Sequence, residues 1–208
     1  MTPLRQLFAA IASADDAEVL ALLTASPALA QAVCEDGATR ASATENYLSP
    51  IEHYVYAGDT ALHVAAAAHR PALVRKLIRL GAATSARNRR GAQPLHYAAD
   101  GLPGSSHWNP AAQAESIAAL IAAGADPNAV DAGGVTPLHR AVRTRCAEAV
   151  GALLRGGGDP HRENKQGSTP MKLATQPTGR GGSGSPAARA QQAEIVTLLE
   201  RHGAKRPA

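Results

Sequence analysis

The segment Gly134-Val135-Thr136-Pro137-Leu138-His139-Arg140-Ala141 recurs in altered form along most of the chain. The other copies are Gly58-Asp59-Thr60-Ala61-Leu62-His63-Val64-Ala65, Gly91-Ala92-Gln93-Pro94-Leu95-His96-Tyr97-Ala98 and Gly167-Ser168-Thr169-Pro170-Met171-Lys172-Leu173-Ala174. Their leading glycines are 33, 43 and 33 residues apart. A period of this length indicates a repeat protein, in which each unit packs only against its neighbours.

A 33-residue period that carries Thr-Pro-Leu-His-x-Ala resembles the ankyrin repeat. The resemblance implies an all-α solenoid of about five stacked helix pairs with short β-hairpin-like fingers, which serves as a binding scaffold. We expect a single ankyrin-repeat domain over residues 1–208. Its expected units are an N-terminal capping repeat with an inserted finger (1–57), a repeat (58–90), a repeat with an inserted loop (91–133), a repeat (134–166) and a C-terminal repeat with a Gly/Ser-rich inserted loop (167–208).

Three insertions lengthen these units. The first adds 22 residues between about positions 27 and 56, and it holds Tyr47, Tyr54 and Tyr56. The alternation in Ile51–Tyr56 predicts a strand there. The apolar surface of the tyrosines predicts that the insertion packs on the concave face or covers a partner. Positions 101–110 and 176–188 have turn-forming compositions, so we expect loops there, with a helix over 115–123 after the first of them.

The repeated Thr and His positions are expected to be structural. In the ankyrin family the Thr hydroxyl and the Pro start the first helix, and the His side chain hydrogen-bonds within its repeat and toward the next. Carried over residue by residue, this role falls to Thr60, His63, His96, Thr136, His139 and Thr169.

The sequence does not predict a catalytic centre, a metal site or a cofactor. Cys34 and Cys146 are far apart and form no C-x-x-C motif, so we expect two reduced thiols. Residues 179–184 match G-x-G-x-x-G, but the expected surroundings are a loop and not a βαβ unit, so we treat the match as accidental. No apolar run reaches the length of a membrane span.

Partner contacts are expected at the finger tips and on the exposed face of the first helices, as in the ankyrin family. The residues at these positions are Tyr54, Tyr56, Arg89, Arg90, Ala132, Arg143, Thr144 and Lys165. Tyrosine and arginine commonly anchor interfaces. Trp108, the single tryptophan, lies in the second insertion, which we expect along the edge opposite the fingers. It is a secondary candidate, either covering that edge or forming a separate docking site.

Together these features predict a non-catalytic adaptor that binds an unidentified protein with acidic groups, with no small-molecule substrate and no membrane contact. We expect a cytoplasmic monomer, and the Ala, Arg, Gly and Pro bias is typical of a GC-rich bacterial genome. One alternative is nucleic-acid binding, since Lys and Arg number 21 against 17 Asp and Glu. Others are a secreted bacterial effector that binds a host protein, and an enzyme built from the insertions.

Overall fold

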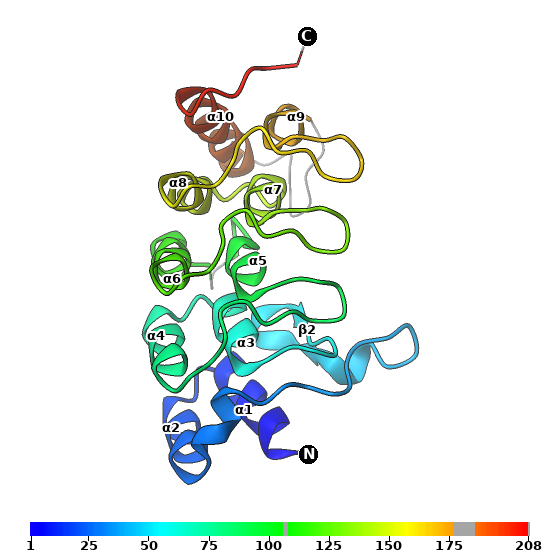
Figure 1. Cartoon of the computed structure of the whole chain (residues 1–208), viewed down its shortest axis with the longest axis vertical. Coiled ribbons are helices and arrows are strands. Elements are labelled where there is room, and N and C mark those ends of the chain that lie inside the picture. Colours follow the sequence, from blue (N-terminus) through cyan, green and yellow to red (C-terminus); the bar gives the residue numbers. More distant parts are fainter. Residues whose placement is uncertain (106–107, 177–185, 208) are drawn as a thin grey trace.

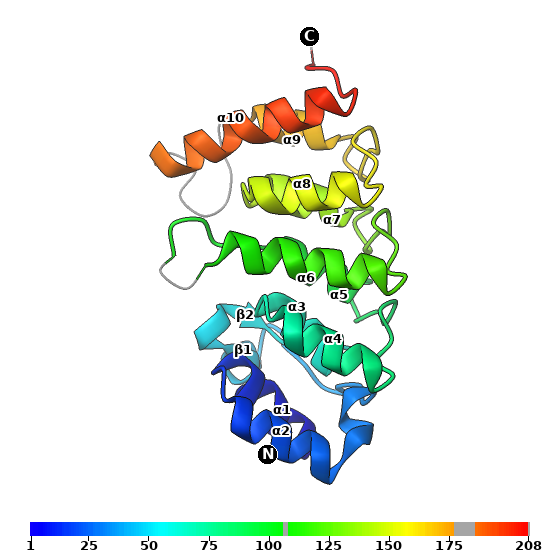
Figure 2. The ribbon, with the colours of Figure 1, turned by 90° about the vertical axis from the view of Figure 1, so that its left-hand side faces the viewer.

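The computed structural model describes residues 1–105, 108–176 and 186–207, without the side chains of residues 187 and 188. Its helices form two columns that run the length of an elongated stack (Figures 1 and 2). The first helices are α1 (Pro3–Ala12), α3 (Ala61–Ala67), α5 (Pro94–Ala99), α7 (Pro137–Arg143) and α9 (Pro170–Thr175). The second helices are α2 (Asp16–Ala25), α4 (Pro71–Arg79), α6 (Pro110–Ala122), α8 (Ala147–Arg155) and α10 (Pro186–Arg201). This is the predicted all-α solenoid.

Residues at the N-termini explain where the helices begin. Thr136 and Thr169 accept hydrogen bonds from the backbone at the third helical position, and a proline follows each of them. Asn109 does the same for α6, so that helix begins at Pro110 and not at the expected residue 115. The helix α10 likewise begins at Pro186, inside the segment expected to be a loop.

Small and branched apolar side chains fill the space between the columns. Many of the buried residues are alanines, which let neighbouring helices approach closely. The second helices contribute larger side chains that are fully or almost fully buried: Leu77, Ile117, Leu120, Val150, Leu153, Ile195 and Leu199. Each helix contacts the partner in its own pair, and successive helices of each column contact each other along the stack from α1 in the first column and from α4 in the second.

The first insertion folds into short irregular elements. These are the 3₁₀ turns η1 (Pro27–Ala30), η2 (Thr44–Asn46) and η3 (Ser49–Ile51) and the strands β1 (Tyr47–Leu48) and β2 (His53–Tyr54). The strands pair antiparallel, with Tyr47 opposite Tyr54. The predicted strand over 51–56 was therefore too long, because Ile51 ends a 3₁₀ turn and Glu52 adopts a left-handed conformation with φ of 48°. Arg5 of α1 connects the insertion to the first helix, because its guanidinium donates a hydrogen bond to Asn46 Oδ1 at 2.5 Å.

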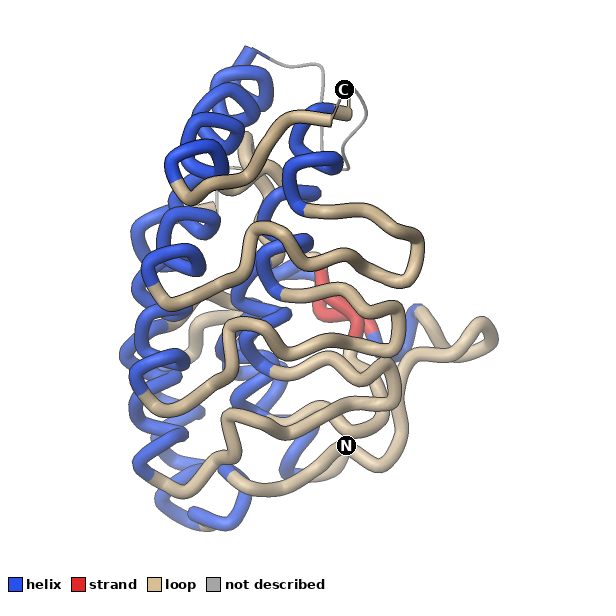
Figure 3. Tube along the Cα trace, turned by 45° about the horizontal axis from the view of Figure 1, so that its top comes forward, coloured by secondary structure: helices blue, strands red, loops and turns tan. Residues whose placement is uncertain are grey.

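The fingers project from the side of the first helices and lie one above another (Figures 1 and 3). Backbone hydrogen bonds join successive fingers. The amide of Arg89 donates to the carbonyl of Ala57 at 2.7 Å, that of Ala132 to Arg90 at 2.9 Å, and that of Lys165 to Gly133 at 3.0 Å. Because these bonds fix the spacing of the fingers, side chains on neighbouring fingers have fixed neighbours.

Candidate functional site

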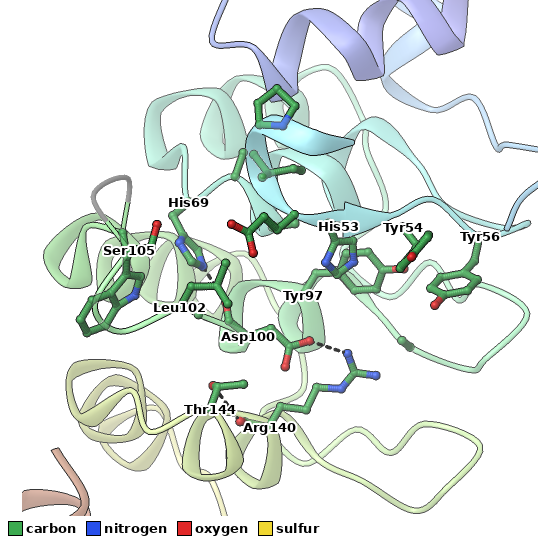
Figure 4. Close-up of a pocket in the computed structure, with 18 of the residues that line it drawn as sticks. His53, Tyr54, Tyr56, His69, Tyr97, Asp100, Leu102, Ser105, Arg140 and Thr144 are labelled. Carbon is green, nitrogen blue, oxygen red and sulfur yellow. Dashed lines mark hydrogen bonds and ion pairs between the residues drawn. The ribbon is translucent and has the colours of Figure 1, made fainter. Parts of the chain in front are cut away.

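A cavity of about 400 Å³ lies between the first insertion and the first helices. Tyr54 and Tyr56 stand at one end and Leu102 and Ser105 at the other (Figure 4). The middle of the wall is formed by His53 of β2, Tyr97 of α5, Asp100 at the end of α5, and Arg140 of α7. Its size falls within the range of about 300–1,000 Å³ common among ligand pockets.

Two wall residues occupy the same position of the repeated motif. Tyr97 and Arg140 are the variable residue between His and Ala in their repeats, and the stacking of α5 on α7 brings the two repeats together. The preceding copy has Val64 at this position. Sequence reasoning missed Tyr97, Arg140 and Asp100 as candidate site residues. The signal that could have revealed the first two was the change of residue type at one motif position.

Arg140 holds two carboxylates together at the cavity wall. Its Nη1 is 2.8 Å from Asp100 Oδ2, and its Nη2 is 3.1 Å from Asp131 Oδ2. Burial acts to raise the pKa of Asp131, but hydrogen bonds from Arg140 and from two backbone amides outweigh it and lower that pKa below its usual value. Since burial disfavours an isolated charge, removal of Arg140 would leave Asp100 and Asp131 as partly buried charges without their cation.

His53 packs against Tyr97, with 4.3 Å between the ring centroids. Burial lowers the pKa of His53, so the ring is neutral near pH 7. Its Nε2 has no hydrogen-bond partner in the described part of the chain. Nearby, His69 Nε2 lies 2.9 Å from the carbonyl of Asp100. Burial lowers the pKa of His69 as well.

A buried hydrogen-bond network lies behind the wall. Asp59, which is fully buried, accepts from the amide of Tyr56 at 2.7 Å and from the hydroxyl of Tyr97 at 2.9 Å. The side-chain amide of Asn88 donates to both Asp59 and Tyr97, while its Oδ1 accepts from the backbone amides of Arg90 and Ala92. One network therefore fixes the backbone that carries Tyr56 and the finger that carries Arg90.

Two guanidinium groups lie over the ring of Tyr56. The Cζ atoms of Arg89 and Arg90 are 5.4 and 5.1 Å from its centroid. Arg90 also donates to the Tyr56 hydroxyl at 3.0 Å, and Arg89 donates to the carbonyl of Ala38. Three of the residues expected at the interface thus form one cationic and aromatic cluster, and Arg89 is in addition tied to the inserted finger.

The other expected contact residues are distributed over the same side. Arg143 and Thr144 line the cavity, and the Thr144 hydroxyl donates back to the carbonyl of Arg140 at 3.0 Å. Ala132 and Lys165 are exposed on their fingers and do not line the cavity.

Trp108 does not form a separate site. The connection from α5 to α6, which carries it, lies on the side of the stack opposite the fingers, as expected (Figure 2), but Trp108 nevertheless lines the same cavity as Tyr54 and Tyr56. Its indole Nε1 donates to Gln113 Oε1 at 2.8 Å. The cause is the length of the first insertion, which reaches across the first helices toward the loop that carries Trp108.

The motif histidines connect adjacent repeats. In His63, Nδ1 accepts from the Thr60 amide at 3.2 Å, so the proton is on Nε2, which donates to the carbonyl of Ala92 at 3.2 Å. His96 and His139 make equivalent contacts to the carbonyls of Val135 and Ser168. Burial lowers the pKa of all three, to about 4 for His96. Gln93, where the motif has Thr, also takes part in a capping box.

The remaining expectations concern metals, thiols and the glycine-rich match. Within the described residues, no group of three or more His, Cys, Asp and Glu side chains could hold a metal ion. Cys34 and Cys146 are free and buried. The G-x-G-x-x-G match at 179–184 lies outside the described residues. No described helix is long and apolar enough to cross a membrane.

Comparison with known proteins agrees with this architecture. A family model described as ankyrin repeats (many copies) matches residues 46–98 and 120–174, slightly more than half of the chain. The matched segments include the strands of the insertion, the buried network and the motif histidines. No curated protein matches the chain.

Proposed function

This chain belongs to the ankyrin-repeat family, and from that premise we propose that it is a non-catalytic adaptor whose partner protein binds on the fingers and first helices. Ankyrin repeats are generally protein–protein interaction modules, and the family is typically a non-enzymatic scaffold. The proposal includes the expectations, which rest on the sequence alone, of a monomer that acts in the cytoplasm and of a partner with acidic groups.

The observation that carries the proposal is the cluster of Tyr56, Arg89 and Arg90. Both guanidinium groups lie over the tyrosine ring, both arginines are exposed, and neither forms an ion pair within the described residues. An aromatic ring between two cations offers a large contact area and several N–H donors, which suits a carboxylate-bearing surface. The buried network around Asp59 holds this cluster in place before a partner arrives.

An affinity capture tests the proposal. Wild-type protein and a Tyr56→Ala/Arg89→Glu/Arg90→Glu variant are immobilised and exposed to lysate of the source organism, and mass spectrometry identifies the retained proteins. Circular dichroism first establishes that the variant keeps the wild-type helicity. A Lys76→Glu/Arg79→Glu variant controls for the reversal of two positive charges, here on α4 and away from the fingers.

We expect a protein that wild type and the α4 variant retain and the finger variant loses. Retention of the same protein by all three would place the interface elsewhere and contradict the proposal. Retention of nucleic acid, with affinity that falls steeply with salt, would favour the alternative of nucleic-acid binding. If nothing is retained from this lysate, capture from a host-cell lysate tests the effector alternative.

A further inference from the structure

The cavity beside the finger cluster has two chemically different ends. Tyr56 stands at one end and Leu102 and Ser105 at the other (Figure 4). Arg90 binds the Tyr56 hydroxyl and makes the first end cationic, while Trp108, whose amide donates to the carbonyl of Ser105, makes the second end apolar together with Leu102. Leu102 is 38% exposed, although it is a large apolar side chain, and Tyr54 is 40% exposed. A partner that covered these groups would remove apolar surface from water, which is favourable.

The charges on the wall favour an acidic ligand at the Tyr56 end. Three arginines, Arg90, Arg140 and Arg143, outnumber the two carboxylates of Glu52 and Asp100. Asp100 is already paired with Arg140, and Arg140 is also paired with Asp131. Arg90 is exposed, and in the described part of the chain it is bound to a hydroxyl and not to a carboxylate.

Two nitrogen atoms of wall residues, Nε2 of His53 and Nε of Arg140, have no hydrogen-bond partner among the described residues, but both are buried under the wall and do not face the cavity. A ligand in the cavity therefore binds the exposed groups at its two ends. An extended polypeptide segment suits this arrangement, because its side chains stand at regular spacing along it and one can lie at each end.

We infer that this cavity binds a short extended segment of the partner protein, with an acidic side chain at the Tyr56–Arg90 end and an apolar side chain at the Leu102–Trp108 end. This inference rests on the proposed adaptor function and names the chemistry that the adaptor recognises. The cavity exists because two insertions meet there, so its specificity belongs to this chain and not to the repeat motif alone.

Selection from a phage-displayed library of random 12-residue peptides on the immobilised full chain tests the inference. The most enriched peptide is then synthesised with a fluorophore, together with versions in which its acidic residue becomes Asn or Gln and its apolar residue becomes Ser. Fluorescence anisotropy measures each version against wild type, Arg90→Gln, Leu102→Ser and the control Arg79→Gln, which removes an exposed cation of α4.

We expect enriched peptides to combine Asp or Glu with an apolar residue. Removal of the peptide's carboxylate should weaken binding to wild type about tenfold or more, as for a charge-assisted hydrogen bond. With Arg90→Gln, removal of the peptide's carboxylate should change the affinity little, because the arginine that contacts this group is already absent. With Leu102→Ser, removal of the peptide's apolar side chain should likewise change the affinity little. Arg79→Gln should behave as wild type.

The inference is overturned if no peptide is enriched, if enriched peptides lack an acidic residue, or if neither cavity variant alters the response. If the lysate capture still returns a protein that the finger variant loses, the adaptor proposal survives without this cavity. A capture in which that variant keeps the partner defeats the adaptor proposal itself.

Discussion

The hydroxyl of Tyr97 donates a 2.9 Å hydrogen bond to the carboxylate of Asp59, across 38 residues of sequence and inside a fully buried network. The pairing joins α5 of one repeat to the segment that precedes α3 of the repeat before it. Burial and the neighbouring carboxylate raise the pKa of Tyr97, so the phenol keeps its proton at neutral pH and well above it. Asp59 therefore has this donor throughout that range.

Tyr97→Phe tests how much this contact stabilises the fold. The variant keeps the ring against His53 but leaves the buried carboxylate one donor short, so we expect a loss of about 1–3 kcal/mol in the free energy of unfolding. Urea denaturation measures it. The matched control is Tyr54→Phe, which removes an exposed hydroxyl and should change stability by less than about 0.5 kcal/mol. Equal losses of unfolding free energy in the two variants would mean that the buried Tyr97–Asp59 hydrogen bond stabilises the fold no more than an exposed hydroxyl does.

The network also shows what the sequence could predict and what it could not. Helix pairs, caps and the insertions follow from local patterns, such as Thr136 before Pro137 or the 33-residue period. The contacts of Asp59 depend on how neighbouring fingers align, which no local pattern encodes. For a related reason the sequence did not predict that Trp108 and Tyr56 line one cavity, because the reach of the first insertion depends on its tertiary packing.

Lengths of individual elements were harder to predict than their existence. The helix after the second insertion begins at Pro110 because Asn109 caps it, although the sequence pattern first becomes clearly helical five residues later. Residues of the cavity wall could not be predicted from local patterns, because α5, α7 and the first insertion are far apart in sequence and meet only in the folded chain. The position held by Val64, Tyr97 and Arg140 carries a different residue in every copy of the motif, and two of these residues form part of the cavity wall.

Stability should fall steeply on mild acidification. Burial lowers the pKa of His53, His63, His69, His96 and His139, and that of His96 falls to about 4. Between that value and the unfolded pKa of about 6.5, the unfolded chain binds protons that the native chain does not. The neutral histidines therefore contribute fully above about pH 6.5, and their contribution is lost as the pH falls below it. For His96 this loss approaches about 1.4 kcal/mol per pH unit between the two pKa values.

Urea denaturation between pH 8 and pH 4 measures this slope. His96→Gln should be less stable at pH 7.5, because the contact to the carbonyl of Val135 changes, but its stability should fall less steeply below pH 6.5. Parallel curves for wild type and His96→Gln would show that protonation of His96 is not linked to unfolding.

Both thiols should be slow to react in the native protein. Burial raises the pKa of Cys146 to about 11 and also raises the pKa of Cys34. The thiolate is the reactive form, so at pH 8 little of either residue is reactive. We expect native protein to react with an aromatic disulfide reagent at least about tenfold more slowly than protein in urea. Single Cys34→Ala and Cys146→Ala variants assign the two phases, and rapid labelling of native Cys146 would contradict its burial.

A last prediction concerns Arg140, whose side chain is 11% exposed between Asp100 and Asp131. Arg140→Gln leaves two partly buried carboxylates facing each other without their cation, and we expect a loss of about 2–4 kcal/mol at pH 7. Adding Asp131→Asn to this variant should restore part of that loss, since one of the opposed charges is then gone.

The pH dependence of the same variant gives an independent measurement. In wild type the lowered pKa of Asp131 means that its ionised form stabilises the fold at neutral pH and that this contribution is lost as the pH falls through the folded pKa. Without Arg140 the buried carboxylate is costly when ionised, so protonation relieves it. The stability difference between wild type and Arg140→Gln should therefore shrink as the pH falls from 7 to 4. A difference that stays constant over this range would show that Arg140 acts by packing and not by charge.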